Sequence, residues 1–164
     1  MSTPRPSAAT GAAPLDELAR SLRALVDRDE ITRLVFRLGY ALDAGDAEQL
    51  RDLFVEDATA RTPGGTAEGV EAVVRQAARN HRPEDGIQHH VSNVLVDLDG
   101  DQATVRSNLL VTFARREPVA DKPVTLGEVY SFEVRRTVDG WRLASVVVEP
   151  VWASRSPVTL LRAG

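Results

Sequence analysis

Apolar residues recur at intervals of three and four along the first part of the chain, from Leu15 to Val26. This spacing is typical of a helix, and it predicts one over residues 15–44. Asp27, followed three residues later by Glu30, matches a capping box, so a bend or a restart of the helix is expected near Asp27. The chain therefore opens with a long helical segment.

Shorter elements follow this helix. Asp46 suits the N-cap of a second helix over 47–54, because its side chain can accept from a free backbone N–H. A short strand is expected at 58–61. After a Pro-Gly-Gly turn, Thr66 is expected to cap a third helix that runs to about His81.

Beyond residue 86 the apolar period changes to two, which is typical of strands. Asp99-Gly100 and Asp139-Gly140 are strong signals for tight hairpins. The expected strands span 88–98, 103–116, 125–136 and 141–151. Helices followed by a meander of long strands predict an α+β fold, with helices on one face of a curved antiparallel sheet.

Composition narrows this picture. The 164 residues are 43% hydrophobic and 27% charged, with a formal charge of −4. These values favour one globular domain, which we place at 15–155 between a disordered tail (1–14) and a C-terminal tail (156–164). Neither a basic face nor a long apolar run is present, so nucleic acid and membrane partners are not expected. No cysteine occurs, which is compatible with the cytoplasm where we expect the protein.

Asp43 is the first candidate for chemistry. On a wheel at about 100° per residue, it shares an apolar side, away from Arg33, with Phe36, Gly39 and Tyr40. A carboxylate pointing where a core residue is expected needs a partner, because burying it alone is costly. Asp43 is therefore either a pocket residue, a cap before the following turn, or a partner for a nearby arginine.

The histidines give a second candidate. His89 and His90 are neighbours on an expected strand, so they point to opposite faces and only one can line an interior pocket. They cannot bind one metal together, and His81 is expected at a helix end in solvent. With no cysteine and no helical histidine pair, no metal site and no cofactor are predicted.

Aromatic side chains complete the candidate set. Tyr40 and Tyr130 each suit either a hydrogen bond to a substrate carbonyl or an ordinary core position. Trp152 lies beyond the last long strand and suits either the mouth of a pocket or a dimer interface.

Three stretches of the chain resemble the SnoaL-like branch of the NTF2-like superfamily. They run from Asp29-Glu30-Ile31 through Leu42-Asp43-Ala44-Gly45-Asp46, from Gln88-His89-His90 to Asp99-Gly100, and from Gly127 and Tyr130 to Asp139-Gly140-Trp141. The resemblance covers roughly residues 15–153 and implies a cone in which helices pack on a curved sheet. The fold alone does not define a reaction, because this scaffold hosts many chemistries.

The scytalone dehydratase-like members are the most similar. In them an Asp at the end of the first long helix faces a His at the start of a strand, and Asp43 and His89 match these two residues. The resemblance thus favours His89 over His90 and implies a catalytic dyad. The second pocket histidine of that enzyme is missing, since Phe113 falls near its place.

The resulting hypothesis is a cofactor-independent acid–base enzyme, a lyase, isomerase or cyclase, acting on a small hydrophobic carbonyl compound of natural-product type. His89 would move the proton and Asp43 would orient its ring. Tyr40, Asn93, Phe113, Tyr130 and Trp152 are the expected substrate-binding residues. The alternatives are a non-catalytic small-molecule-binding protein and a structural subunit of a larger oxygenase. The resemblance also implies a homodimer through the outer face of the sheet.

Overall fold

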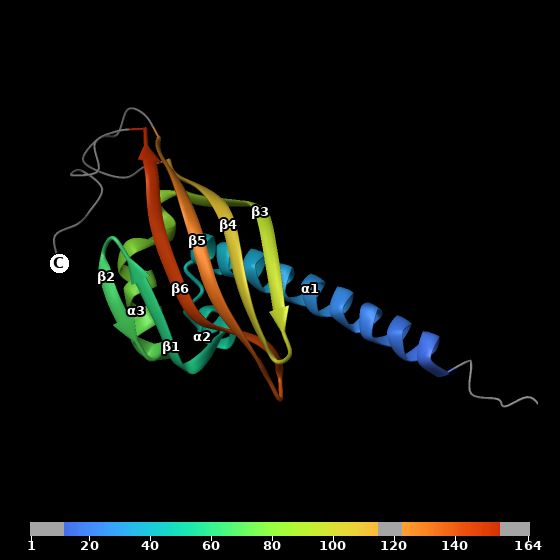
Figure 1. Cartoon of the computed structure of the whole chain (residues 1–164). Coiled ribbons are helices and arrows are strands. Elements are labelled where there is room, and N and C mark those ends of the chain that lie inside the picture. The colour runs from blue at the N-terminus through green and yellow to red at the C-terminus, as the bar shows by residue number, and fades with distance from the viewer. Residues whose placement is uncertain (1–11, 115–122, 155–164) are drawn as a thin grey trace, which may run out of the picture.

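The computed structural model describes residues 12–114 and 123–154, in which helices cover one face of a single curved sheet (Figure 1). The expected C-terminal tail and most of the N-terminal one lie outside these residues, and the helix begins at Ala12 rather than Leu15. The helical elements are α1 (Ala12–Ala44), α2 (Ala47–Leu53), α3 (Val70–Asn80) and the 3₁₀ turn η1 (Pro83–Asp85). The strands are β1 (Phe54–Thr62), β2 (Gly65–Glu68), β3 (Ile87–Asp99), β4 (Gln102–Phe113), β5 (Val124–Thr137) and β6 (Gly140–Ala153).

The six strands lie in the order β2-β1-β6-β5-β4-β3, and four of the five neighbouring pairs are antiparallel. The exception is β1, which pairs in parallel with β6, with Ala60 opposite Val146. The sheet is therefore mixed rather than purely antiparallel. The alternation of the last four strands predicted their pairing, but it carries no information on the direction in which β1 joins them.

The short elements after α1 are partly as predicted. Asp46 caps α2, accepting from the backbone N–H of Gln49 at 2.9 Å. Thr66, in contrast, does not cap a helix, because it lies in β2 opposite Arg61 of β1. The helix starts four residues later, after Gly69, whose φ of 81° suits a glycine. The sequence around Thr66 fits either the cap of a helix or a strand of a hairpin, and pairing with β1 selects the strand.

α1 continues without a break past Asp27 and has two different apolar sides. Its core side beyond Asp27 is formed by Ile31, Leu34, Val35, Leu38, Ala41 and Leu42, all buried against the sheet. Phe36 and Tyr40, which the wheel placed on the inner side, are exposed. The expected restart at Asp27 is absent because that carboxylate is buried and bonded to the sheet, where Trp141 Nε1 donates to it at 3.2 Å.

Figure 1 shows the N-terminal part of α1 projecting beyond the sheet. No helix among the described residues combines the length and apolar character needed to cross a membrane. The core lies between the second half of α1, α2, α3 and the inner face of the sheet. The site described next opens from this core.

Candidate active site

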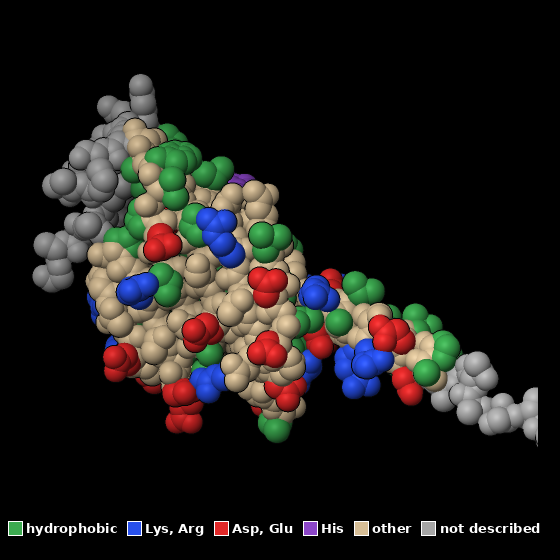
Figure 2. All heavy atoms as spheres, in the orientation of Figure 1, with side chains coloured by type: hydrophobic (Ala, Val, Ile, Leu, Met, Phe, Trp, Pro, Cys, Tyr) green, Lys and Arg blue, Asp and Glu red, His purple; other side chains and the backbone are tan. Residues whose placement is uncertain are grey.

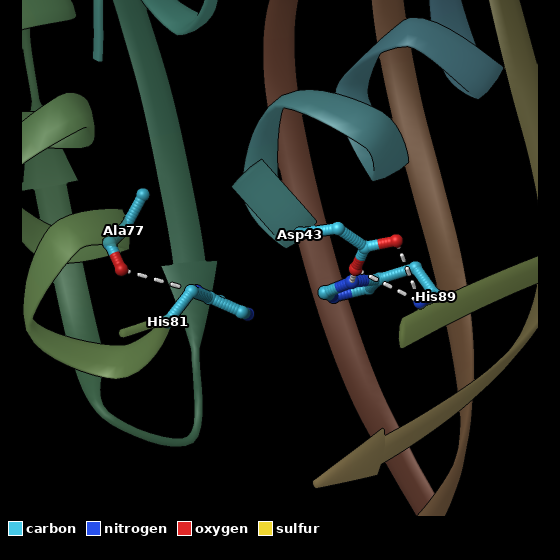
Figure 3. Close-up of polar contacts among 4 residues, drawn as sticks. All are labelled: Asp43, Ala77, His81 and His89. Carbon is cyan, nitrogen blue, oxygen red and sulfur yellow. Dashed lines mark hydrogen bonds and ion pairs between the residues drawn. The ribbon is translucent and has the colours of Figure 1, made fainter. Parts of the chain in front are cut away.

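Asp43 and His89 are hydrogen-bonded, as the resemblance implied. Asp43 lies in the last turn of α1, and His89 is the third residue of β3 (Figure 3). Asp43 Oδ1 is 2.6 Å from His89 Nδ1, and the backbone N–H of His89 donates to Oδ1 at 3.0 Å and to Oδ2 at 3.2 Å. Three contacts to one carboxylate fix the position and rotation of the imidazole.

Local sequence explains how β3 comes so close to the helix. Gly39 faces His89, and a Cβ atom at position 39 would lie 3.4 Å from His89 Cβ. An alanine there would be in ordinary van der Waals contact with His89, whereas a longer side chain would push the strand away from α1. Gly39 was expected on the same side as Asp43, and the structure places it against His89.

The other ring nitrogen of His89 is buried and unpaired. The side chain of His89 is 1% exposed, and its Nε2 has no hydrogen-bond partner among the described residues. Because Asp43 accepts from Nδ1, the proton of a neutral imidazole resides on Nδ1 and leaves a lone pair on Nε2. An oriented imidazole with a free basic nitrogen in the interior is the arrangement needed for general-base chemistry.

His81 lies beside this pair, although it was expected in solvent. It follows the last turn of α3, with Nδ1 3.1 Å from the carbonyl oxygen of Ala77 (Figure 3). Its ring centroid is 5.2 Å from that of His89 and 6.5 Å from that of Phe113. The helical period placed His81 at a helix end correctly, but only the tertiary fold shows that this end turns inward.

A cavity of about 60 Å³ occupies the core beside His81. Its walls are mainly apolar, with Leu38, Leu42, Phe54 and Val146 among them, and Tyr130 and Gln76 add polar atoms. A second hollow of about 120 Å³ lies next to it, bounded by the turn after α1 and by η1. The two share a wall formed by Leu42, Leu50, Val74, Ala77 and His81.

Glu128 is a buried carboxyl group that no sequence motif marked. It lies on β5 between Leu109 of β4 and Pro150 of β6, on the inner face that also carries Tyr130. No hydrogen bond or ion pair of its side chain occurs within the described part of the chain, and burial raises the pKa of Glu128 to about 7. The only signal for it in the sequence was its position two residues before Tyr130, because residues two apart on a strand face the same side of the sheet.

Tyr130 is buried against the same interior. Its ring meets that of Phe132 edge-on at 5.5 Å, and Ser107, whose buried hydroxyl lacks a partner among the described residues, lies opposite it on β4. Burial, followed by the negative charges of Glu128 and Asp43, raises the pKa of the Tyr130 hydroxyl. Tyr130 therefore stays neutral and can donate a hydrogen bond, as a carbonyl-binding residue must.

The remaining predicted residues are divided. Phe113 is buried beside His81, near the site. Tyr40 is 73% exposed and does not line the cavity. Asn93 is also exposed, since a bulge between Ser92 and Leu95 gives it a φ of 53° and breaks the alternation that would place it beside His89.

Trp152 is half-exposed and packs over Gly127, where any Cβ atom would collide with its indole ring. Gly127 pairs with the exposed Leu110, whereas the inward-facing residues around it are buried. Trp152 is therefore on the outer face of the sheet and does not close the inner cavity. Among the described residues no three His, Asp or Glu side chains gather closely enough to hold a metal ion.

The fold and the site define an α+β cone with a hydrogen-bonded Asp–His pair inside. Comparison gives the family: residues 23–147 match the model of the SnoaL-like domain, and the chain belongs to this family. No protein of curated function matches the sequence.

Solved structures give the same fold. An NTF2-like protein with a cystatin-like fold from Novosphingobium aromaticivorans is 31% identical, covering 93% of this chain and 100% of its own at a TM-score of 0.68. A proposed scytalone dehydratase from the same organism is 26% identical, covering 81% and 89% at 0.71. A proposed aromatic ring hydroxylase, also from that organism, is 25% identical, covering 83% and 97% at 0.68.

Proposed function

We propose that the protein is a cofactor-independent acid–base enzyme, a lyase, isomerase or cyclase, that acts on a small hydrophobic carbonyl compound of natural-product type. The observation that carries this proposal is the free Nε2 of His89, buried while Nδ1 is held by Asp43. The similarity to a proposed scytalone dehydratase supports the same class of reaction.

In the proposed reaction, His89 Nε2 accepts a proton from the carbon next to the substrate carbonyl. The electron pair of the broken C–H bond forms the C=C bond of an enolate or enol, and Asp43 stabilises the resulting imidazolium. The developing charge on the substrate oxygen needs a hydrogen-bond donor. Neutral Tyr130 and protonated Glu128 face the same interior and supply this donor.

The size of the hollows limits how a substrate enters. The core cavity is smaller than the roughly 150 Å³ that admits benzene in an engineered protein cavity, so an organic ligand cannot occupy it without movement. The second hollow shares a wall with it, and displacement of His81 or Leu42 from that wall would join the two. We propose that the substrate enters beside η1 and that its apolar part occupies the joined space.

A proton-exchange experiment tests the base directly, without knowledge of the natural substrate. The protein is incubated in D₂O with a panel of cyclic and aryl ketones, and loss of the α-proton signals is followed by ¹H NMR. We expect catalysed exchange that falls by about 10²–10⁴-fold in His89→Ala. The matched control is His90→Ala, which removes the exposed neighbouring ring and should exchange at the rate of the unmodified protein.

Two other results would assign a different function. Ligand binding without exchange or turnover across the panel would indicate a non-catalytic binding protein. Full activity of both Asp43→Asn and His89→Ala would instead overturn the assignment of the acid–base pair. Co-purification with a large oxygenase subunit would indicate a structural subunit, a role kept open by the similarity to a proposed aromatic ring hydroxylase. The predicted homodimer and the predicted cytoplasmic location stay predictions.

A further inference from the structure

The core cavity has a polar end that the proposed reaction does not use. Thr62, the last residue of β1, lines this end together with Gln76 and Asn80 of α3, whereas most of the remaining lining is apolar. Gln76 is only 3% exposed, so its amide lies inside the protein. Buried polar side chains are normally hydrogen-bonded, and the donor and the acceptor of this amide each need a partner.

Only the donor half of the Gln76 amide is satisfied. Its Nε2 donates to the carbonyl oxygen of Gly65 at 2.8 Å and to Thr62 Oγ1 at 3.4 Å. Because a backbone carbonyl can only accept, the contact with Gly65 fixes which end of the amide is the nitrogen. Oε1 accepts no hydrogen bond within the described part of the chain. Gln76 therefore holds a fixed, unused acceptor in the lining of the cavity.

Thr62 supplies a donor beside this acceptor. Its Oγ1 accepts from the backbone N–H of Gly64 at 3.1 Å and from Gln76 Nε2, so the hydroxyl hydrogen is not used in either contact. No acceptor for that hydrogen occurs among the described residues. One unused acceptor and one unused donor thus lie together at one end of the cavity, and we call this pair of side chains the amide site.

The surroundings of the amide site select a neutral ligand group. No Asp, Glu, Lys or Arg occurs among the described residues that line the cavity, whereas Figure 2 shows such side chains mixed with apolar ones over the surface. A carboxylate or an ammonium group would lose its hydration there without gaining a counter-charge, which is costly. A hydroxyl group fits, because it can donate to Gln76 Oε1 and accept from Thr62 Oγ1 at the same time.

The amide site is remote from the Asp43–His89 pair. Thr62 is on β1 and His89 is on β3, four strand spacings away in the sheet, or about 19 Å along its curve. Figure 3 shows His81 at the end of α3 on one side and the pair on the other. A hydroxyl bound at the amide site is therefore not a group that leaves from the reacting part of the substrate, and it serves recognition.

We propose that Gln76 and Thr62 form a specificity site that binds a remote hydroxyl group of a hydrophobic carbonyl substrate. This assignment rests on the proposed function, which places the reacting carbonyl near His89. The substrates are then hydroxylated carbonyl compounds long enough to reach from the pair to β1. A compound that lacks the hydroxyl leaves Gln76 Oε1 buried without a partner and is bound less tightly.

A matched pair of ligands tests the amide site. Benzylacetone and its para-hydroxy derivative differ by one hydroxyl group, and their dissociation constants are measured by isothermal titration calorimetry. We expect the hydroxylated ligand to bind about 10-fold more tightly to the unmodified protein. Thr62→Val keeps the shape of the side chain and should abolish this preference, whereas Thr62→Ser keeps the hydroxyl and should retain it. The matched control is Thr104→Val, an exposed position on β4, which should also retain it.

Gln76→Leu should abolish the preference as well, and its melting curve shows whether loss of the contact with Gly65 unfolds the protein. Equal affinity for the two ligands, failure of both to bind, or a preference that survives Thr62→Val overturns the specificity site. Proton exchange of the same two ketones in D₂O is measured separately. A hydroxyl preference without exchange would support the amide site and contradict the proposed enzyme, whereas exchange without a preference would do the reverse.

Discussion

Helix α1 places two carboxylates against the sheet, and the two are surrounded in different ways. Asp27 accepts from Trp141 and pairs with Arg136 at 2.7 Å, and the guanidinium of Arg136 also stacks over the Trp141 ring at 4.3 Å. Among the described residues, Asp43 is hydrogen-bonded to the backbone and the ring of His89, whose second nitrogen has no partner there. The first carboxylate is satisfied by a permanent cation, and the second by a group that can gain and lose a proton.

This difference separates a carboxylate that holds the helix to the sheet from one that orients an imidazole. The hydrogen bond from Arg136 holds the pKa of Asp27 below its usual value, because the guanidinium favours the charged form. Asp27 is bonded to an arginine and an indole, whereas Asp43 is bonded to an imidazole whose second nitrogen is buried without a partner among the described residues. The two carboxylates therefore differ in their partners.

The largest expected effect concerns Asp43. Asp43→Asn keeps an oxygen for His89 Nδ1 but removes the charge that stabilises the imidazolium, so we expect proton exchange to fall by about 10²–10⁴-fold. The melting temperature should change little. Asp27→Asn should show the reverse, with near-normal exchange and a lower melting temperature. Equal loss of exchange in Asp43→Asn and Asp27→Asn would contradict the different roles assigned to the two carboxylates.

Glu128 sharpens the comparison, because its carboxyl group has no hydrogen-bond or ion-pair partner among the described residues. Its folded pKa is raised to about 7 from an ordinary value of 4.5, so the folded state prefers the protonated form. Stability from this group is complete below pH 4.5, declines as the pH rises and is lost above about 7. Glu128→Gln should therefore be more stable than the unmodified protein at pH 8, by on the order of 2–3 kcal/mol, and equally stable at pH 4.

Chemical denaturation of both proteins at several pH values measures this difference. ¹³C NMR of labelled glutamate side chains supplies an independent check, since one carboxyl should titrate near pH 7. A stability difference that does not vary with pH would show that Glu128 is not desolvated.

A smaller effect is expected from removing Asp27. Asp27→Ala leaves Trp141 Nε1 and Arg136 without their acceptor, at a cost of about 1–2 kcal/mol. Because the folded pKa of Asp27 is lowered, its contribution is present above the unfolded value near 4 and is lost as the pH falls through the folded one. Urea melts should therefore show a larger difference between the variant and its parent at pH 7 than at pH 3.

The smallest effect is expected at Tyr40. Its side chain is 73% exposed and does not line the cavity, so Tyr40→Phe should leave proton exchange and melting temperature unchanged. Tyr130→Phe is the matched comparison, because it removes the buried hydroxyl and should slow exchange. A strong loss in Tyr40→Phe would place the substrate on the exposed side of α1.

Local sequence was a good guide wherever local chemistry decides the structure. Asp46 and the Asp99-Gly100 turn act through neighbours in the chain, and both were predicted. Asp43 and His89 lie 46 positions apart, and their pairing was inferred from resemblance and not from any local pattern. The inward position of His81 and the lack of a partner for Glu128 among the described residues depend on residues that are distant in the sequence. Local hydrophobic periodicity carries no information about such neighbours.

The exposed face of α1 shows a related limit. A helical wheel finds an apolar side but does not say which side meets the protein, and α1 has apolar residues on both. Leu34 and Phe36 are two positions apart, and the sheet buries one and leaves the other in solvent. The rotation of the helix is fixed by tertiary contacts such as the one from Asp27 to Trp141.

The bulge that turns Asn93 outward has a consequence for how the sheet ends. β3 is one of the two outermost strands, and such a strand offers free backbone donors and acceptors to any other extended chain. The irregular register between Ser92 and Leu95 interrupts this row halfway, and β2 at the opposite border is only four residues long. Growth of the sheet by addition of strands from other molecules is thereby obstructed at both borders. Straightening the bulge by deleting Asn93 should make the protein prone to fibril formation at high concentration.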